Sequence, residues 1–288
     1  MKTTSIPYVL LVLLLSMAGC KKDINKTEHL LYFRFNFDST QVRLNNFGQP
    51  DTIIPSGHGA QSPLMHKMSA HYIELAADSL TPLGSGYVLY KAYETNQGGA
   101  TAIDFSQAFI VGANTTFFSI PVESLTPGTY RWLRVSLSYQ NYDVNFKYGS
   151  MMLQGRLASF IGYNTYIGSF APNDHSVTVN ANKLQGYWGF EIDTMGFDTV
   201  FTGQAAGTTV PNPISASSPI PPGSCVVTGE FAEPLVITGQ EDHDVGIIVS
   251  LSVNKSFEWK DLSGDNIYEP PYDTVVDMGV RGMIPTVQ

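Results

Sequence analysis

The feature of this sequence that most constrains its fold is a strict alternation of apolar and polar residues in short runs. In residues 30–38, LLYFRFNFD, the apolar side chains of Leu31, Phe33, Phe35 and Phe37 alternate with more polar ones. Successive side chains of a β-strand point to opposite faces, so this period of two predicts a half-buried strand.

The same pattern returns along the rest of the chain. It is found at residues 71–77, 87–93, 115–122, 129–146, 175–181, 186–193, 224–231, 234–239 and 245–253. Turn-forming residues such as Thr126-Pro127-Gly128 separate most of these runs, and no long helical stretch, repeat or heptad interrupts them. We therefore predict an all-β protein, an antiparallel β-sandwich or sandwiches with few or no helices.

The longest run, residues 129–146, has two faces of different character. Arg131, Leu133, Val135, Leu137 and Tyr139 share one face, and the residues between them share the other. The first face carries more aliphatic side chains, so we expect it to point into the core.

The amino terminus has the composition of a secretory signal. Lys2 supplies a positive charge, residues 8–17 are almost entirely apolar, and the small residues Ala18 and Gly19 precede a cysteine. The apolar run is about a dozen residues, shorter than the roughly 20 that a membrane-spanning helix needs. We therefore expect residues 1–19 to be a cleaved signal peptide.

Met17-Ala18-Gly19-Cys20 resembles the lipobox of bacterial lipoproteins. The resemblance implies that Cys20 is lipidated on its sulfur and acylated on its new amine, with residues 20–28 as a tether. Two or more acyl chains suffice for stable anchoring, because each buried methylene contributes about 0.8 kcal/mol. The alternative is a cleaved, freely secreted protein with an incidental cysteine.

The position after the cysteine bears on the destination of the protein. Lys21, where inner-membrane lipoproteins have aspartate, resembles the sorting pattern for the outer membrane. Segments such as RFNFDSTQVRLNNFGQP and SFEWKDLSGDNIYEPPYDTVVDMGVRGMIP are also similar to a family of exported Bacteroidota lipoproteins, over nearly the whole mature chain. These resemblances imply a lipid-anchored address at the outer membrane, on its periplasmic or its surface side, and no particular activity.

Length and composition bound the remaining possibilities. Residues 29–288 are long enough for one β domain or for two β subdomains divided near residue 150. Loss of residues 1–19 removes only Lys2, so 25 acidic side chains face 15 basic ones. Nucleic-acid binding needs clustered Lys and Arg, so we expect no nucleic-acid partner.

Cys225, in a Val-rich run, is expected to pack as a small apolar residue.

One segment holds three of the six histidines. His58, His66 and His71 are interspersed with Met65 and Met68. Imidazole with thioether suits copper, and imidazole with carboxylate suits zinc, so the segment is a candidate copper or zinc site. The alternative is a loop whose histidines are solvent-exposed or hydrogen-bonded. Together with SIPVESLTPGTYRWLRVSL, the layout is also similar to β-sandwich copper-binding proteins associated with methanobactin uptake.

A second candidate metal site is rich in oxygen ligands. In DLSGDNIYEPPYD, Asp261, Ser263 and Asp265 alternate and Glu269 follows, a set of oxygens that suits calcium. Asn266 stands where an EF-hand has glycine, so this is not an EF-hand. The alternative is a polar hairpin loop between the strands SFEWK and TVVDMGV.

No catalytic motif accompanies these features. Gly-x-Ser-x-Gly and a Gly-rich phosphate loop are both missing from the sequence. We therefore expect a non-catalytic binding or accessory module of the cell envelope, with an envelope protein or a glycan as partner. Tyrosines and tryptophans such as Tyr163 and Trp188 can stack on sugar rings, so a glycan-binding or glycan-processing surface protein is an alternative.

Overall fold

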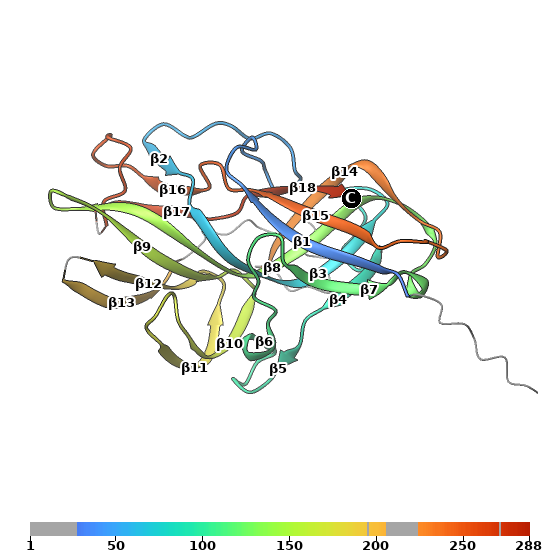
Figure 1. The fold of residues 1–288 in the computed structure, drawn as a ribbon. Helices are drawn as coiled ribbons and strands as arrows, with labels where there is room; N and C mark the ends of the chain where they lie inside the picture. Colours follow the sequence, from blue (N-terminus) through green and yellow to red (C-terminus); the bar gives the residue numbers. More distant parts are fainter. Residues whose placement is uncertain (1–27, 195, 206–223, 271) are drawn as a thin grey trace, which may run out of the picture.

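The structure is a computed structural model that describes residues 28–194, 196–205, 224–270 and 272–288. The described chain consists mainly of strands in four sheets (Figure 1). Its two helical elements are short 3-10 turns, η1 (Phe105–Gln107) and η2 (Val122–Ser124). The predicted all-β sandwich is confirmed. The expected signal peptide and Cys20 lie outside the described residues.

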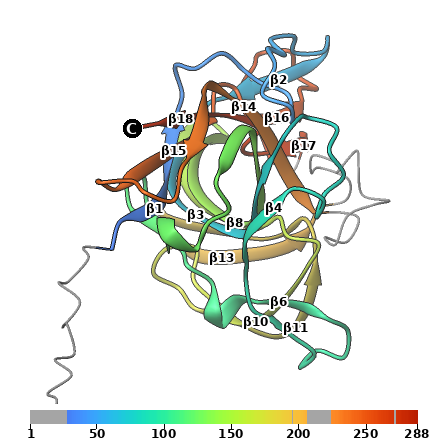
Figure 2. The ribbon, with the colours of Figure 1, turned by 90° about the vertical axis from the view of Figure 1, so that its right-hand side faces the viewer.

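The largest sheet has seven strands and β8 at its centre. β8 pairs with β3, β9 and β14, and the sheet curls around its own axis (Figure 2). Its strands are β3 (Leu64–Ala76), β4 (Tyr87–Lys91), β8 (Gly128–Tyr148), β9 (Met151–Phe160), β12 (Tyr187–Thr194), β13 (Phe197–Gln204) and β14 (Cys225–Ile237). Within the described residues, no helix is both long and apolar enough to span a membrane.

A four-stranded sheet packs against the β3, β8 and β14 part of the large sheet and completes the sandwich. Phe33, Phe35 and Ile247 are fully buried in the main core, together with Val135 and Val227 from the large sheet. The pairing of β1 with β15 is parallel, and the others in this sheet are antiparallel. Its strands, in spatial order, are β18 (Gly282–Val287), β15 (Val245–Ser252), β1 (Leu30–Asp38) and β7 (Thr116–Pro121).

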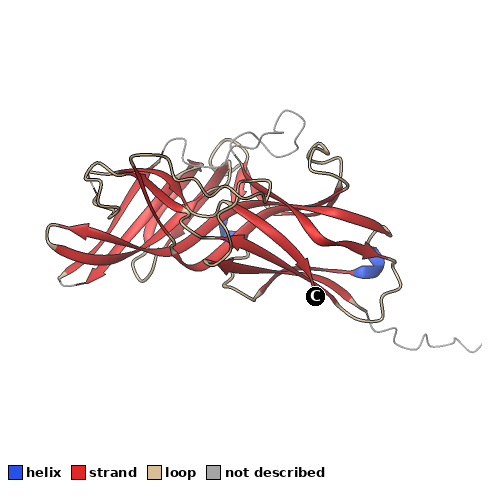
Figure 3. Ribbon diagram, turned by 90° about the horizontal axis from the view of Figure 1, so that it is seen from above, coloured by secondary structure: helices blue, strands red, loops and turns tan. Residues whose placement is uncertain are grey.

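Two smaller sheets cover opposite faces of the β8, β9 and β12 part of the large sheet (Figure 1). The view from above in Figure 3 shows how strongly strands predominate in the described chain. On one face Phe160 packs against Phe170, and on the other Tyr142 packs against Phe257. The two sheets consist of β2 (His58–Gln61), β16 (Phe257–Lys260) and β17 (Thr274–Met278), and of β5 (Glu94–Thr95), β6 (Ala102–Asp104), β10 (Asn164–Phe170) and β11 (Val177–Leu184).

The change of face along β8 has a local cause. Ser69 of β3 pairs with Tyr139 and Ala70 pairs with Leu137, so Ser138 is an extra residue in the ladder. An extra residue reverses which face each later side chain occupies. Leu137 therefore lies in the main core, whereas Tyr139 lies in the core beneath β10.

The predicted core face of residues 129–146 is only partly correct. Arg131 is exposed, whereas Arg134, expected on the outer face, is fully buried beside Glu74. The Glu74 carboxylate accepts hydrogen bonds from the backbone N–H groups of Gly84 and Gly86, at 3.0 and 2.6 Å. Both faces of β8 are covered, so alternation does not mark a single inner side there.

Residues 149–150 form the turn of the β8–β9 hairpin, whose strands pair from Tyr148–Met151 to Tyr139–Phe160. The division into two subdomains near residue 150 stays a prediction. Cys225 is a free thiol buried in the main core, as expected, and burial raises its pKa to about 12.

The packing of Phe190 on Gly155 yields a stability prediction. A Cβ at Gly155 would lie 2.3 Å from the Phe190 ring, whereas one at Gly168 would have no neighbour closer than 3.9 Å. Since overpacking costs about 2 kcal/mol, we expect Gly155→Ala to lower the free energy of unfolding by that amount, measured with urea. Gly168→Ala is the matched control and should change it by less than about 0.5 kcal/mol. Equal effects of the two substitutions would contradict this packing.

Candidate ligand-binding site

A cavity of ≈820 Å³ lies between the β8, β9, β12 and β13 part of the large sheet and the β16–β17 hairpin. Ligand pockets in proteins have volumes of about 300–1,000 Å³. The lining is mostly aromatic and aliphatic and comes from segments far apart in the sequence. It consists of Val144, Phe146, Tyr148, Leu153, Leu157, Trp188, Phe190, Ile192, Phe201, Thr202, Gln204, Ala205, Phe257, Tyr268, Pro270, Asp273, Thr274, Val275 and Met278.

Aromatic pairs on the two sides of the cavity make its walls firm. Phe146 and Phe190 of the large sheet meet edge to face, with ring centroids 5.4 Å apart. On the opposite wall Phe257 meets Tyr268 in the same way at 5.2 Å. Such pairs contribute about 0.5–1.5 kcal/mol beyond the area they bury. Burial raises the pKa of Tyr268 to about 12, so its hydroxyl is neutral at physiological pH.

Among the described residues that line the cavity, Asp273 is the one with an acidic side chain. That carboxylate is only 7% exposed and accepts backbone hydrogen bonds from Leu262, at 3.1 Å, and Glu269, at 2.8 Å. It therefore closes the β16–β17 loop and is already stabilised by its own chain. The lining residues include no Lys, Arg or His.

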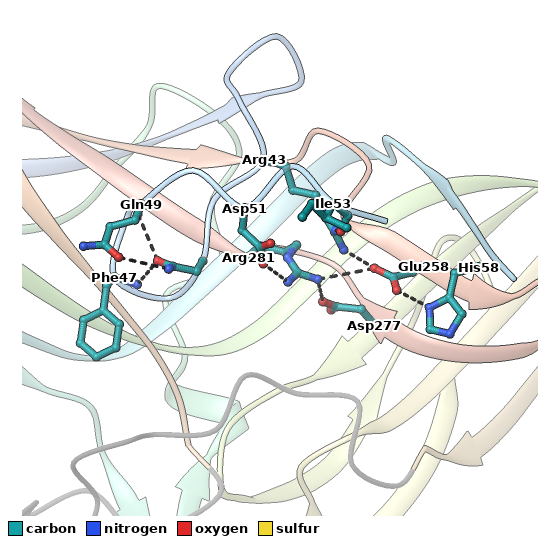
Figure 4. A network of polar contacts seen from close by, with 10 residues as sticks. Arg43, Phe47, Gln49, Asp51, Ile53, His58, Glu258, Asp277 and Arg281 are labelled. Atoms are coloured by element: carbon teal, nitrogen blue, oxygen red, sulfur yellow. Dashed lines mark hydrogen bonds and ion pairs between the residues drawn. The ribbon is translucent and has the colours of Figure 1, made fainter. Parts of the chain in front are cut away.

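The β16–β17 wall is held from behind by a network of charges (Figure 4). Glu258 and Asp277 are cross-strand partners, and their neighbours Phe257 and Met278 line the cavity, so the two carboxylates point away from it. Arg43, 4% exposed, binds Glu258, and Arg281 contacts Asp277 at 2.8 Å and Glu258 at 3.6 Å.

The loop between β1 and β2 closes this network. It supplies Arg43, whose guanidinium also donates to the carbonyl of Ile53 at 2.8 Å, and Asp51, which lies 3.0 Å from Arg281. The buried charges are thus paired across three segments of chain. Removing one partner of a buried pair destabilises a protein by several kcal/mol, so the network fixes the position of the cavity wall.

The carboxyl group of Asp277 has a shifted pKa. Burial raises its pKa to about 7, and the nearby Glu258 acts in the same direction. Arg281 and Arg43 oppose the shift. The carboxyl of Asp277 therefore changes charge near neutral pH.

The three histidines of the candidate copper or zinc site each contact a different carboxylate. The pairs are His58 with Glu258 at 2.5 Å, His66 with Asp143 at 2.8 Å, and His71 with Glu94 at 3.2 Å. His71 is fully buried, and burial lowers its pKa to about 4. The structure thus distributes the three imidazoles over three separate carboxylates.

The methionines of the same segment belong to the packing. Met68 is fully buried in the main core, and Met65 packs against both the main core and the core beneath β16. Among the residues that the structure describes, no group of three or more His, Cys, Asp or Glu side chains is arranged to hold a metal ion. Copper or zinc binding stays a prediction.

The residues of the candidate calcium site lie in one loop. Asp261 and Asp265 both accept a hydrogen bond from the hydroxyl of Ser263, at 3.1 and 2.9 Å, and both also accept from backbone N–H groups of the loop. Lys147 binds Glu269 and lies 3.7 Å from Asp265. The predicted hairpin between β16 and β17 is confirmed, and calcium binding stays a prediction.

The aromatic residues considered for glycan stacking lie in different places. Tyr142 and Tyr187 are buried in the cores, and the hydroxyl of Tyr163 donates to Glu94 at 2.9 Å. Trp188 lines the cavity. The sequence marks the cavity walls only as strands with apolar faces, because nothing in a local pattern distinguishes a phenylalanine that lines a cavity from one that fills a core.

Comparison with protein-family models, curated proteins and solved structures finds no match for this chain.

The raised pKa of Asp277 predicts a pH dependence of stability. Folded Asp277 holds its proton up to about pH 7, whereas the unfolded chain releases it near the ordinary value of 3.8, so rising pH between these values favours unfolding. Between pH 5 and pH 8, the free energy of unfolding of the wild type should fall relative to that of Asp277→Asn by about 2 kcal/mol, because the variant has no proton to release. Urea unfolding of both proteins at each pH measures this difference.

The matched control for this experiment is Glu233→Gln, which changes an exposed carboxylate on β14. Its difference from the wild type should stay constant over the same pH range. Parallel profiles for Asp277→Asn and the wild type would contradict the assignment.

Proposed function

We propose that this chain is a lipid-anchored, non-catalytic binding protein of the bacterial cell envelope, and that its ligand occupies the cavity between the large sheet and the β16–β17 hairpin. The observation that carries the proposal is the ≈820 Å³ cavity with its almost wholly apolar lining. Large apolar pockets with a few polar groups are the usual binding sites of small molecules.

The chemistry of the lining supports binding rather than turnover. Its hydroxyl and amide groups include those of the exposed Thr202, Gln204 and Thr274 and of Tyr268, and no histidine that could activate them stands among the described lining residues. Both carboxylate oxygens of Asp273 accept backbone hydrogen bonds within its own loop. These groups can orient a ligand, and none of them is a prepared nucleophile.

The arrangement of the ends of the fold is compatible with anchoring through Cys20. The described chain begins beside β1 at one end of the molecule, and the turn of the β8–β9 hairpin and the paired ends of β12 and β13 lie toward the opposite end (Figure 1). Anchoring at the amino terminus would leave the hairpin end, with cavity residues such as Tyr148 and Ile192, facing away from the membrane.

Binding to the cavity is tested with N-phenyl-1-naphthylamine, an uncharged probe that fluoresces in apolar surroundings. We expect saturable binding at one site, and Val275→Trp, which fills the cavity, should weaken it at least tenfold. Val236→Trp places the same side chain at a position that is 57% exposed on β14 and should leave binding unchanged. Circular dichroism verifies that both variants are folded. Equal probe binding by wild type and Val275→Trp would refute the site.

The anchor is tested by expressing the chain with residues 1–19 in a Gram-negative host. The product should enter the detergent phase of a Triton X-114 partition, and its mass should exceed that of residues 20–288 by the attached acyl groups. Cys20→Ala removes the lipid acceptor and should remain in the aqueous phase. A wild-type product of bare polypeptide mass in the aqueous phase would show that the protein is not lipid-anchored.

A further inference from the structure

We infer that the cavity selects an uncharged apolar molecule, such as a long-chain alcohol or an acyl ester, over a fatty acid or a cationic amphiphile of the same length. The inference rests on the proposed function and specifies its ligand class.

The lining extends along the strands for several residues. Val144, Phe146 and Tyr148 are alternate residues of β8, and Trp188, Phe190 and Ile192 are alternate residues of β12. Alternate residues point to the same face, and a strand rises about 3.3 Å per residue, so four residue steps extend roughly 13 Å. The apolar wall is therefore long enough to cover most of an alkyl chain.

The charge of the lining disfavours an anionic head group. The lining residues provide no positive side chain, and Asp273 would face a bound carboxylate with a charge of the same sign. Lys147 stands between two lining residues in the sequence, but its ammonium binds Glu269 and lies 3.7 Å from Asp265. A fatty acid would therefore lose hydration without gaining a counter-charge.

A cationic head group would gain little binding energy from the carboxylate of Asp273. The Asp273 carboxylate already accepts two backbone hydrogen bonds, which disperse its charge and hold it in the loop. Thr202, Thr274 and the neutral hydroxyl of Tyr268 are partners for a hydroxyl or ester group instead. Neutral polar groups in an apolar pocket orient a ligand without requiring a buried ion pair.

The test is displacement of N-phenyl-1-naphthylamine by 1-dodecanol, dodecanoate and dodecyltrimethylammonium at pH 7.5, each below its aggregation concentration. Dodecanol should bind at least tenfold more tightly than either charged compound. Decanol, undecanol and dodecanol should differ by about fourfold in affinity per added methylene, the factor that corresponds to burial of one methylene group.

A charge introduced into the lining provides the second arm. Thr274→Lys places an ammonium at the cavity and should increase the affinity for dodecanoate, relative to that for dodecanol, at least tenfold. Val236→Lys, at an exposed position on β14, is the matched control and should change neither affinity.

The outcomes separate the ligand class from the proposed function. If dodecanoate or the ammonium compound binds wild-type protein as tightly as dodecanol, while Val275→Trp still abolishes probe binding, the selection for uncharged ligands is wrong and the cavity remains the binding site. If none of the three displaces the probe and Val275→Trp binds it normally, the inference and the proposed function both fail.

Discussion

The fold depends on one strand, β8, whose 21 residues run through the whole large sheet and serve two different cores. The extra residue at Ser138 makes this possible, because the side chains before and after it occupy opposite faces. The Ser138 carbonyl accepts hydrogen bonds from the N–H groups of both Ile161 and Gly162, at 3.0 and 3.2 Å, so the carbonyl at the irregularity remains paired. One half of β8 thereby builds the sandwich, and the other half carries the wall of the cavity.

Much of this architecture could be predicted from the sequence where burial is one-sided. Alternation identifies β1 and β15, because one face of each is buried against the large sheet. Alternation does not show which strands pair with each other, so the parallel pairing of β1 with β15 could not be predicted. The burial of Arg134 cannot be predicted for the same reason. Local sequence places a charged arginine at the surface, and the residue that allows its burial, Glu74, lies on another strand.

The candidate site was less predictable than the fold. Sequence reasoning selects residue types with ligating side chains, and it therefore indicates the calcium candidates Asp261, Ser263, Asp265 and Glu269 and, as copper or zinc candidates, the segment with His58, His66 and His71. The structure gives each of the three histidines a carboxylate of its own, which is a three-dimensional relation that spacing does not show. The cavity is made of ordinary strand residues such as Phe146 and Phe190. Only the distance between two layers of strands decides whether such residues fill a core or surround a space.

The parallel pairing of β1 with β15 has a consequence for how the chain acquires its fold. Leu31 pairs with Val245 and Asp38 with Ser252, so one edge of β1 has no native partner until the chain has been synthesised as far as Ser252. Pairings of such high contact order form slowly, and an apolar strand with an open edge can associate with other chains. Protection of this edge during biogenesis thus matters for the yield of folded protein.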